Sequence, residues 1–234
     1  MKNIALLCLL LIGVPGKKQN AASSAPAVPD HELEAVLSQM DKVSAGFKSA
    51  QADFEWDNYQ TVFKETDKQT GSVYFSRHSS SVETMFDVNT PGAKQILFKD
   101  GKLMLYNPKI DQITEYEPEK SKTDVQAFLN LGFGARGHDL LKTFDVKMAG
   151  WETIDSVKTA RLELAALSPK VRTMFSQFIL WIDPQRDVPI KQQVFEPSGD
   201  YWLSHYTGFK LGAKLPDDVF NIKKTSKTKV VKPQ

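Results

Sequence analysis

The stretch that decides the fold is ILFKDGKLMLY, residues 96–106. Two apolar runs flank the dipeptide Asp100-Gly101, which suits a type I′ hairpin turn because both central residues of that turn need positive φ. The stretch therefore predicts two antiparallel strands joined by a tight turn.

Alternating patterns on both sides extend this hairpin into a larger sheet. Apolar and polar residues alternate in the runs 50–57, 71–77 and 82–88, and a side-chain period of two is typical of strands with one apolar face and one wet face. Similar patterns occupy residues 146–151, 159–164, 174–182, 190–196 and 202–209, with turn signals such as Ser168-Pro169 and Asp183-Pro184 between them. These runs predict one long β-meander.

Two segments depart from the strand pattern. The first begins at Asp30, a suitable N-cap, and has apolar residues at helical spacing, which predicts an amphipathic helix. Those apolar positions are Leu33, Val36, Leu37, Met40, Val43 and Phe47. The second segment, Thr123 to Phe144, has two short apolar stretches around a glycine-rich centre and predicts two short helices with a mobile link.

Residues 1–27 are predicted to be a signal peptide and its processing region. Lys2 precedes an apolar run of roughly a dozen residues, which is shorter than the ~20 residues that span a bilayer. Small residues follow, so cleavage after Ala22, Ala25 or Ala27 is consistent with the sequence. An uncleaved membrane anchor is the alternative.

Cys8 is the only cysteine, and it lies inside this apolar run. We interpret it as apolar filler, because Leu6 and Leu7 stand where a lipid-modified cysteine needs small residues; lipidation is the alternative. The rest of the chain has no cysteine, so it can build neither a disulfide framework nor a thiolate metal site.

The charge balance argues against nucleic acid as a partner. The formal charge is +2, and it falls to −1 when three lysines of the N-terminal segment are removed, whereas nucleic-acid binding requires a dense positive surface. Residues 223–234 are a basic tail that we predict to be disordered. Contact of this tail with anionic lipid or an acidic partner is the alternative to a solvated terminus.

Catalytic motifs are missing from the sequence. The four histidines are far apart, none belongs to a spaced metal-ligand motif, and neither a nucleophile elbow nor a phosphate loop occurs. We therefore predict no enzyme activity, no metal and no cofactor. An acid–base pair, either Asp111 with Glu115 or Glu117 with Glu119, is the alternative. The aromatic sheet face could enclose a ligand cavity or a filled core.

The chain resembles the periplasmic outer-membrane lipoprotein carrier family, LolA and its relatives. The resemblance runs through residues 31–222 and is carried by several short motifs in a fixed order. They are the helix-to-strand passage 40–54, the glycine-led strand 71–77, the Asp-Gly-Lys hairpin 99–108, the Leu-Ser-Pro-Lys turn 167–170 and the closing segment 215–222.

The resemblance implies a mainly β fold, an unclosed antiparallel β-barrel made of a strongly curved sheet, with an N-terminal helix and a central helical lid. It implies a carrier domain at residues 28–222, located in the periplasm, that shelters the acyl chains of lipoproteins or lipids. An inner-membrane lipoprotein-releasing transporter would donate the cargo and an outer-membrane acceptor would receive it. We expect a monomer. The alternatives are a lipid-binding or lipid-sensing module, an enzyme on this scaffold, and a membrane-anchored acceptor that would need a lipidated Cys8.

In this family a strand-end arginine latches the lid by hydrogen bonds to its backbone, and Arg77 matches that position. His78 stands where the family has proline, and a solvated strand-end charge is the alternative for Arg77. We predict that apolar residues facing inward line the cavity, although each could equally belong to a filled core. These candidates are Phe54, Trp56, Phe75, Phe86, Leu105, Phe128, Leu129, Phe178 and Leu180.

Overall fold

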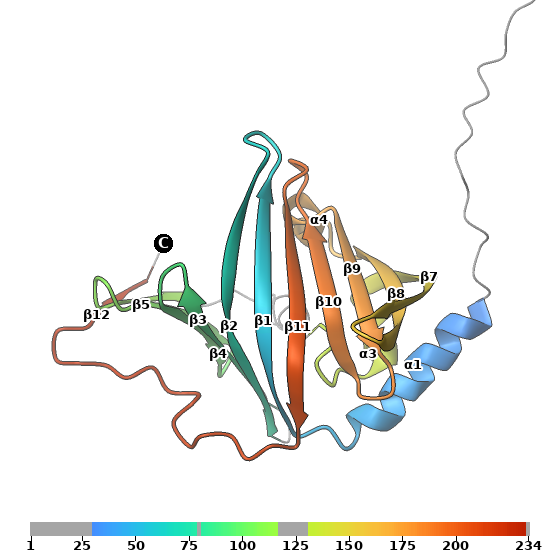
Figure 1. Cartoon of the computed structure of the whole chain (residues 1–234), viewed down its shortest axis with the longest axis horizontal. Helices are drawn as coiled ribbons and strands as arrows, with labels where there is room; N and C mark the ends of the chain where they lie inside the picture. The colour runs from blue at the N-terminus through green and yellow to red at the C-terminus, as the bar shows by residue number, and fades with distance from the viewer. Residues whose placement is uncertain (1–29, 79–80, 117–130, 233–234) are drawn as a thin grey trace, which may run out of the picture.

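A computed structural model describes residues 30–78, 81–116 and 131–232 of the chain. Twelve strands of this described part form one open sheet in the order β12-β6-β5-β4-β3-β2-β1-β11-β10-β9-β8-β7 (Figure 1). The first six strands are β1 (Ser49–Gln60), β2 (Glu65–His78), β3 (Ser81–Thr90), β4 (Lys94–Lys99), β5 (Lys102–Asn107) and β6 (Gln112–Tyr116). The others are β7 (Phe144–Ile154), β8 (Val157–Ala166), β9 (Gln177–Asp183), β10 (Val188–Phe195), β11 (Tyr201–Leu211) and β12 (Lys229–Val231). This mainly β, unclosed and curved architecture confirms the predicted fold class.

The strand order corrects the prediction of one long meander. Strands β1–β6 form one antiparallel meander and β7–β11 form another, and the two are joined where β1 pairs with β11. Figure 1 shows these two strands side by side at the centre of the sheet. Period-two patterning fixes which face a side chain occupies but does not identify the neighbouring strand, which is why the sequence missed this pairing.

The hairpin at residues 96–106 forms as predicted. Phe98 pairs with Leu103 and Lys99 with Lys102, and the turn residues Asp100 and Gly101 have φ values of 53° and 73°. Both values are positive, as a type I′ turn requires.

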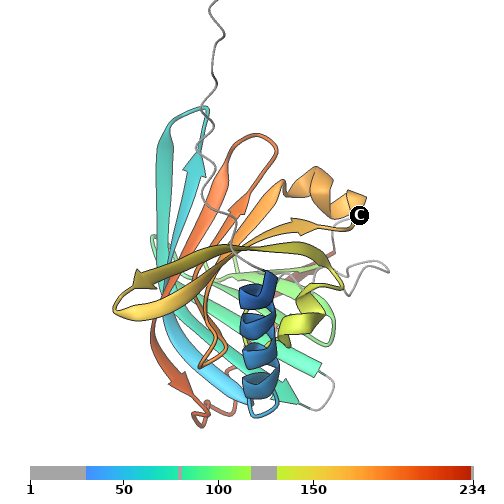
Figure 2. The ribbon, with the colours of Figure 1, turned by 90° about the vertical axis from the view of Figure 1, so that its right-hand side faces the viewer.

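Three helices within the described ranges accompany the sheet: α1 (Asp30–Ser44), α3 (Gly137–Leu140) and α4 (Pro169–Met174). Helix α1 confirms the predicted amphipathic helix, and it buries Val36, Leu37 and Met40 against the sheet. It ends at Ser44, so Phe47, predicted as a helical position, lies beyond it in another core cluster. Figure 2 shows α1 and α3 together on the hollow side of the sheet. Helix α4 occupies a segment interpreted from sequence as a turn, because Pro169 is compatible with a turn and also with the first position of a helix.

Several predictions concern residues outside those that the structure describes. The signal peptide at residues 1–27 and the first of the two central helices, with Phe128 and Leu129, lie there. The second central helix is α3, and the role of this segment as a lid stays a prediction. In the described part of the chain, none of the helices has both the length and the apolar character needed to cross a membrane.

The structure corrects the prediction that the C-terminal tail is disordered. Residues 229–231 form β12, which pairs in parallel with β6, and Thr225 and Thr228 donate hydroxyl hydrogen bonds to Asp111. Just before the tail, Ile222 is buried in a cluster on the outer face of the sheet together with Met85, Leu97 and Ile113. A lysine-rich segment with few apolar residues is typical of disorder. The composition of the tail does not show that the adjacent residue Ile222 anchors it beside a free sheet edge.

Candidate functional site

An apolar cavity of about 410 Å³ lies on the hollow side of the sheet. Its walls come from β1, β3, β4, β10 and β11, from Phe175 after α4, and from Leu131 in the segment before α3. The lining residues are Trp56, Phe86, Ile96, Leu131, Phe175, Gln192, Gln193, Val194, Glu196, Trp202, Ser204 and Tyr206. Pockets lined mostly by aromatic and aliphatic groups with a few polar ones are typical of sites for apolar ligands.

The structure places the predicted cavity residues in three different environments. Trp56 and Phe86 line the cavity, with ring centroids 4.9 Å apart. Phe54 and Phe75 are buried in the same core cluster as Phe86, and the ring centroids of Phe54 and Trp56 are 4.3 Å apart. Phe178 and Leu180 belong to a second core cluster beneath α1. Leu105 on β5 is partly exposed; it pairs with the cavity residue Ile96 but does not line the cavity itself. A ligand-contacting role for any of these residues stays a prediction.

Sequence reasoning missed a polar group inside this cavity. The Tyr206 hydroxyl donates to Gln192 Oε1 at 2.9 Å, and Gln192 Nε2 donates to the carbonyl of Leu131. Burial raises the pKa of Tyr206 to about 12, so its hydroxyl stays a hydrogen-bond donor at neutral pH. The sequence does contain a signal for this polar group, because Gln192 interrupts the inward-facing apolar positions Ile190 and Val194.

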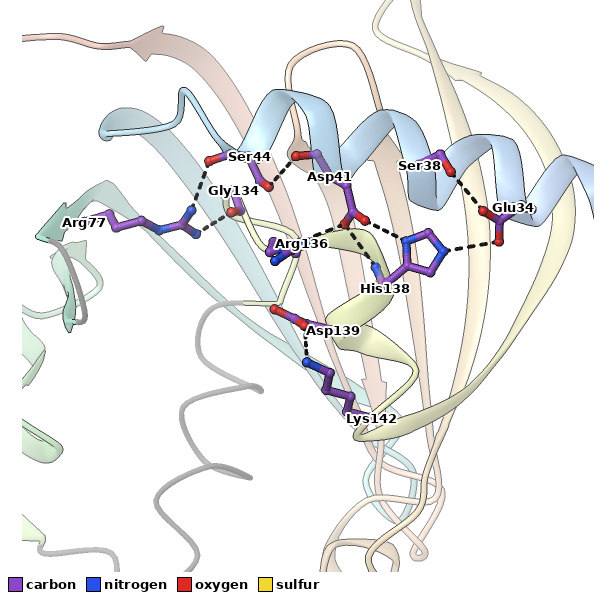
Figure 3. A network of polar contacts seen from close by, with 10 residues as sticks. All are labelled: Glu34, Ser38, Asp41, Ser44, Arg77, Gly134, Arg136, His138, Asp139 and Lys142. Atoms are coloured by element: carbon purple, nitrogen blue, oxygen red, sulfur yellow. Dashed lines mark hydrogen bonds and ion pairs between the residues drawn. The ribbon is translucent and has the colours of Figure 1, made fainter.

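Arg77 lies near the end of β2, where its guanidinium joins two other segments (Figure 3). One NH₂ group donates to the carbonyl of Ser44, the last residue of α1, at 3.2 Å; the other donates to the carbonyl of Gly134. The guanidinium also lies 5.8 Å from the centre of the Phe47 ring. Burial lowers the pKa of Arg77, while the nearby carboxyl groups of Asp187 and Asp139 oppose that shift. Arginine remains charged in proteins, so these are charge-assisted bonds.

Gly134 approaches its neighbours closely. Its φ is +61°, and a Cβ built there would lie 2.4 Å from the Phe47 ring. Its N–H donates to the carbonyl of Asp187 at 2.9 Å, so both backbone polar groups of Gly134 are bound. Only glycine fits here without displacing Phe47. This close approach brings the carbonyl of Gly134 within reach of Arg77.

Asp187, in the turn between β9 and β10, is a buried carboxyl group that sequence analysis did not single out. It is fully buried, and neither carboxyl oxygen has a hydrogen-bond partner among the described residues. Burial raises the pKa of Asp187 to about 8, although the charge of Arg77 opposes the rise. Asp187 is therefore mostly protonated at neutral pH.

The carboxylate pair considered from sequence has a structural role in this fold. Asp111 accepts hydrogen bonds from Thr225 and Thr228, and Glu115 forms an ion pair with Lys102 at 3.0 Å. Glu117 and Glu119 lie outside the described residues. Within the ranges that the structure describes, no three histidine, cysteine, aspartate or glutamate side chains gather as metal ligands.

An open, curved sheet of mostly antiparallel strands with an N-terminal helix is the fold class of the LolA superfamily. A family model for the outer membrane lipoprotein carrier protein LolA matches residues 45–223. The chain belongs to this family, whose members are carrier or binding proteins. No curated protein sequence matches the chain.

Solved structures share the fold at low sequence identity. A conserved protein of uncharacterized function from Thermus thermophilus is 12% identical, with a TM-score of 0.53 over 86% of this chain and 99% of that one. MucB is 13% identical, with a TM-score of 0.52 over 86% of this chain and 66% of MucB. In the Pseudomonas aeruginosa MucA/MucB complex the identity is 13% and the TM-score 0.50, over 82% and 61% of the two chains. The chain thus spans somewhat less than two thirds of the MucB chains.

Proposed function

We propose that this protein is a periplasmic carrier that binds acyl chains of lipoproteins in the apolar cavity and transports them from the inner to the outer membrane. The observation that supports this proposal best is the position of Leu131. This residue lines the cavity, and it is three residues from Gly134, which Arg77 holds. The cavity wall and the proposed latch therefore share one short segment of chain.

The physical need for such a carrier is large. Each buried methylene group contributes ~0.8 kcal/mol, so an acylated protein does not cross an aqueous compartment unsheltered at a useful rate. In this proposal the bonds from Arg77 to Ser44 and Gly134 stabilise the closed, empty form, and loading breaks them. Residues 1–27 would direct export and residues 28–222 would form the carrier domain, with an inner-membrane transporter as donor and an outer-membrane acceptor.

The size of the cavity supports a second candidate, a module that binds or senses a single-chain lipid. A methylene group fills about as much space as a liquid water molecule, ~30 Å³, so a cavity of 410 Å³ holds a chain of about 14 such groups. A lipoprotein anchor with two or three acyl chains needs a larger space. Carrier function therefore requires the cavity to widen, for example by movement of the segment that contains Leu131, whereas single-chain binding does not.

A binding and transfer experiment separates the two candidates. Purified protein is mixed with an acylated lipoprotein, with the same lipoprotein lacking its acyl chains, and with a single-chain fatty acid, and then presented to acceptor membranes. A carrier retains the acylated lipoprotein, whether or not it also binds the fatty acid, and releases it to the membranes. A single-chain module retains the fatty acid but not the lipoprotein. Failure to retain either the acylated lipoprotein or the fatty acid contradicts both proposals.

A further inference from the structure

We propose that His138 is a positioning residue that clamps residues 131–142, hereafter the latch segment, to α1 by bridging the carboxylates of Glu34 and Asp41. The clamp depends on protonation of the imidazole. The existence of the clamp follows from the geometry alone, whereas its effect on ligand binding rests on the proposed function.

His138 contacts two acidic residues of the same helix (Figure 3). Its Nδ1 lies 2.7 Å from Asp41 Oδ2 and its Nε2 lies 3.2 Å from Glu34 Oε2. Its backbone N–H also donates to Asp41 Oδ1 at 3.2 Å. Glu34 and Asp41 are seven residues apart, which places them two turns apart on one face of α1, and both point at the histidine.

The contacts of both ring nitrogens define the protonation state of the clamp. A neutral imidazole has one donor and one acceptor, and a carboxylate oxygen can only accept, so only the imidazolium satisfies both contacts. Hydrogen bonds to Asp41 and then to Glu34 raise the pKa of His138. Hydrogen bonds from Ser38 and then from His138 lower the pKa of Glu34. The clamp is therefore complete at mildly acidic pH and loses one contact when the imidazole is deprotonated.

Other charged groups around the clamp do not replace it. The Nε of Arg136 is 4.0 Å from Asp41 Oδ1, which is the limit of an ion pair, and Asp139 pairs with Lys142 within the latch segment at 2.7 Å. Asp187 contacts the segment through its backbone carbonyl, and its carboxyl group is mostly protonated at neutral pH because burial raises its pKa to about 8. Among the described residues, His138 is the cation that touches both Glu34 and Asp41.

The clamp holds the two acceptors of Arg77 in their relative position. One acceptor is the carbonyl of Ser44 on α1, and the other is the carbonyl of Gly134 in the latch segment. His138 joins these two segments, and it does so where their backbones are in close contact. A Cβ built on Gly137 would lie 2.4 Å from the carbonyl oxygen of Leu37. Losing the clamp lets the two acceptors separate, so Arg77 cannot bind both.

The first test measures hydrogen exchange of the ligand-free full chain, as protection factors for backbone amides in residues 131–142. His138→Gln keeps a hydrogen-bonding side chain but cannot become a cation. The contacts are partly exposed, 38% for His138 and 61% for Glu34, so the expected loss of protection at pH 6 is modest, roughly threefold to tenfold. At pH 9 wild type and variant should coincide. Equal protection at pH 6 would overturn the proposal.

Two further variants make this test specific. His205→Gln is the matched control, because His205 also contacts a carboxylate, Asp155 at 2.5 Å, but this contact joins β11 to the turn between β7 and β8 and not α1 to the latch segment. It should leave the exchange of residues 131–142 unchanged. Glu34→Gln should lower protection in wild type and have no additional effect in the His138→Gln background. Additive effects of the two substitutions would contradict a shared clamp.

The second test connects the clamp to ligand binding, with a triacylated lipoprotein as the probe, because only cargo larger than the cavity requires the latch to open. If loading opens the latch, His138→Gln should bind the probe roughly threefold to tenfold more tightly at pH 6 and equally at pH 9. Absence of probe binding by either protein would count against acyl binding, that is, against the proposed function. The exchange experiment would still decide the clamp by itself.

Discussion

The hollow side of the sheet consists of a filled half and an open half. Over β7–β9, aliphatic side chains of α1 interdigitate with those of the sheet, and Met40, Leu162 and Leu180 are completely buried. Over β1, β3, β4, β10 and β11 the lining is rich in aromatic side chains, and a cavity of about 410 Å³ remains. A helix supplies flexible side chains that fill gaps, whereas rings in edge or tilted contact leave space between them. The cavity therefore lies between the core cluster beneath α1 and a second one over β1–β3, and Leu131 and Val194 belong both to the first cluster and to the cavity wall.

At neutral pH, the largest expected effect is on the core beneath α1. Leu162→Ala removes a fully buried side chain on β8 and should lower the free energy of unfolding by about 2–5 kcal/mol, because the surrounding core cannot collapse onto the space. Urea denaturation measures this loss. Binding of a fatty acid by the folded fraction should stay unchanged, and a parallel loss of affinity would show that the two halves are not separate.

The next effect concerns the latch. Arg77→Leu removes the charge-assisted bonds to Ser44 and Gly134, which contribute on the order of 1.5–3 kcal/mol. The equilibrium constant between the closed, empty form and the open, loaded form should shift roughly tenfold to a hundredfold toward the open form. Cargo should therefore enter but leave slowly. The measurement is transfer of an acylated lipoprotein from the loaded protein to acceptor membranes. Equal release rates for folded wild type and variant would identify Arg77 as a structural charge.

Asp187 provides a test of pH dependence. Its pKa is raised to about 8 in the folded protein, so the folded state holds a proton that the unfolded chain loses near pH 4. This contribution to stability is fully present below about pH 4 and is lost as pH rises toward 8, at up to ~1.4 kcal/mol per pH unit. Asp187→Asn should make the free energy of unfolding less dependent on pH between about pH 4 and pH 8. An unchanged slope in urea denaturation between pH 5 and pH 8 would contradict the assignment.

The smallest effect on stability is expected in the open half. Ser204→Phe places a ring in the cavity and should weaken fatty-acid binding at least tenfold, because it occupies volume that the acyl chain needs. The free energy of unfolding should change by less than about 1.5 kcal/mol, since the space is already present. Ser198→Phe, in the exposed turn between β10 and β11, is the matched control and should leave binding unchanged.

Local sequence patterns determined most of the secondary structure. The Asp100-Gly101 turn, the alternation along β1 and the helical spacing after Asp30 each reflect contacts between residues close in sequence. The same alternation correctly turned Trp56 and Phe86 toward the hollow side. These predictions succeeded because a period of two or 3.6 is a property of the backbone itself.

Only the tertiary structure decided which inward residues border a cavity and which fill a core. Trp56 and Leu180 have equivalent patterns in the sequence, yet α1 covers Leu180 while Trp56 faces open space. The pairing of β1 with β11, the parallel strand β12 and the contacts of His138 with α1 likewise join residues far apart in the chain. Periodicity assigns a side chain to a face, but the partner it meets there depends on how distant segments pack, and a local pattern carries no record of that.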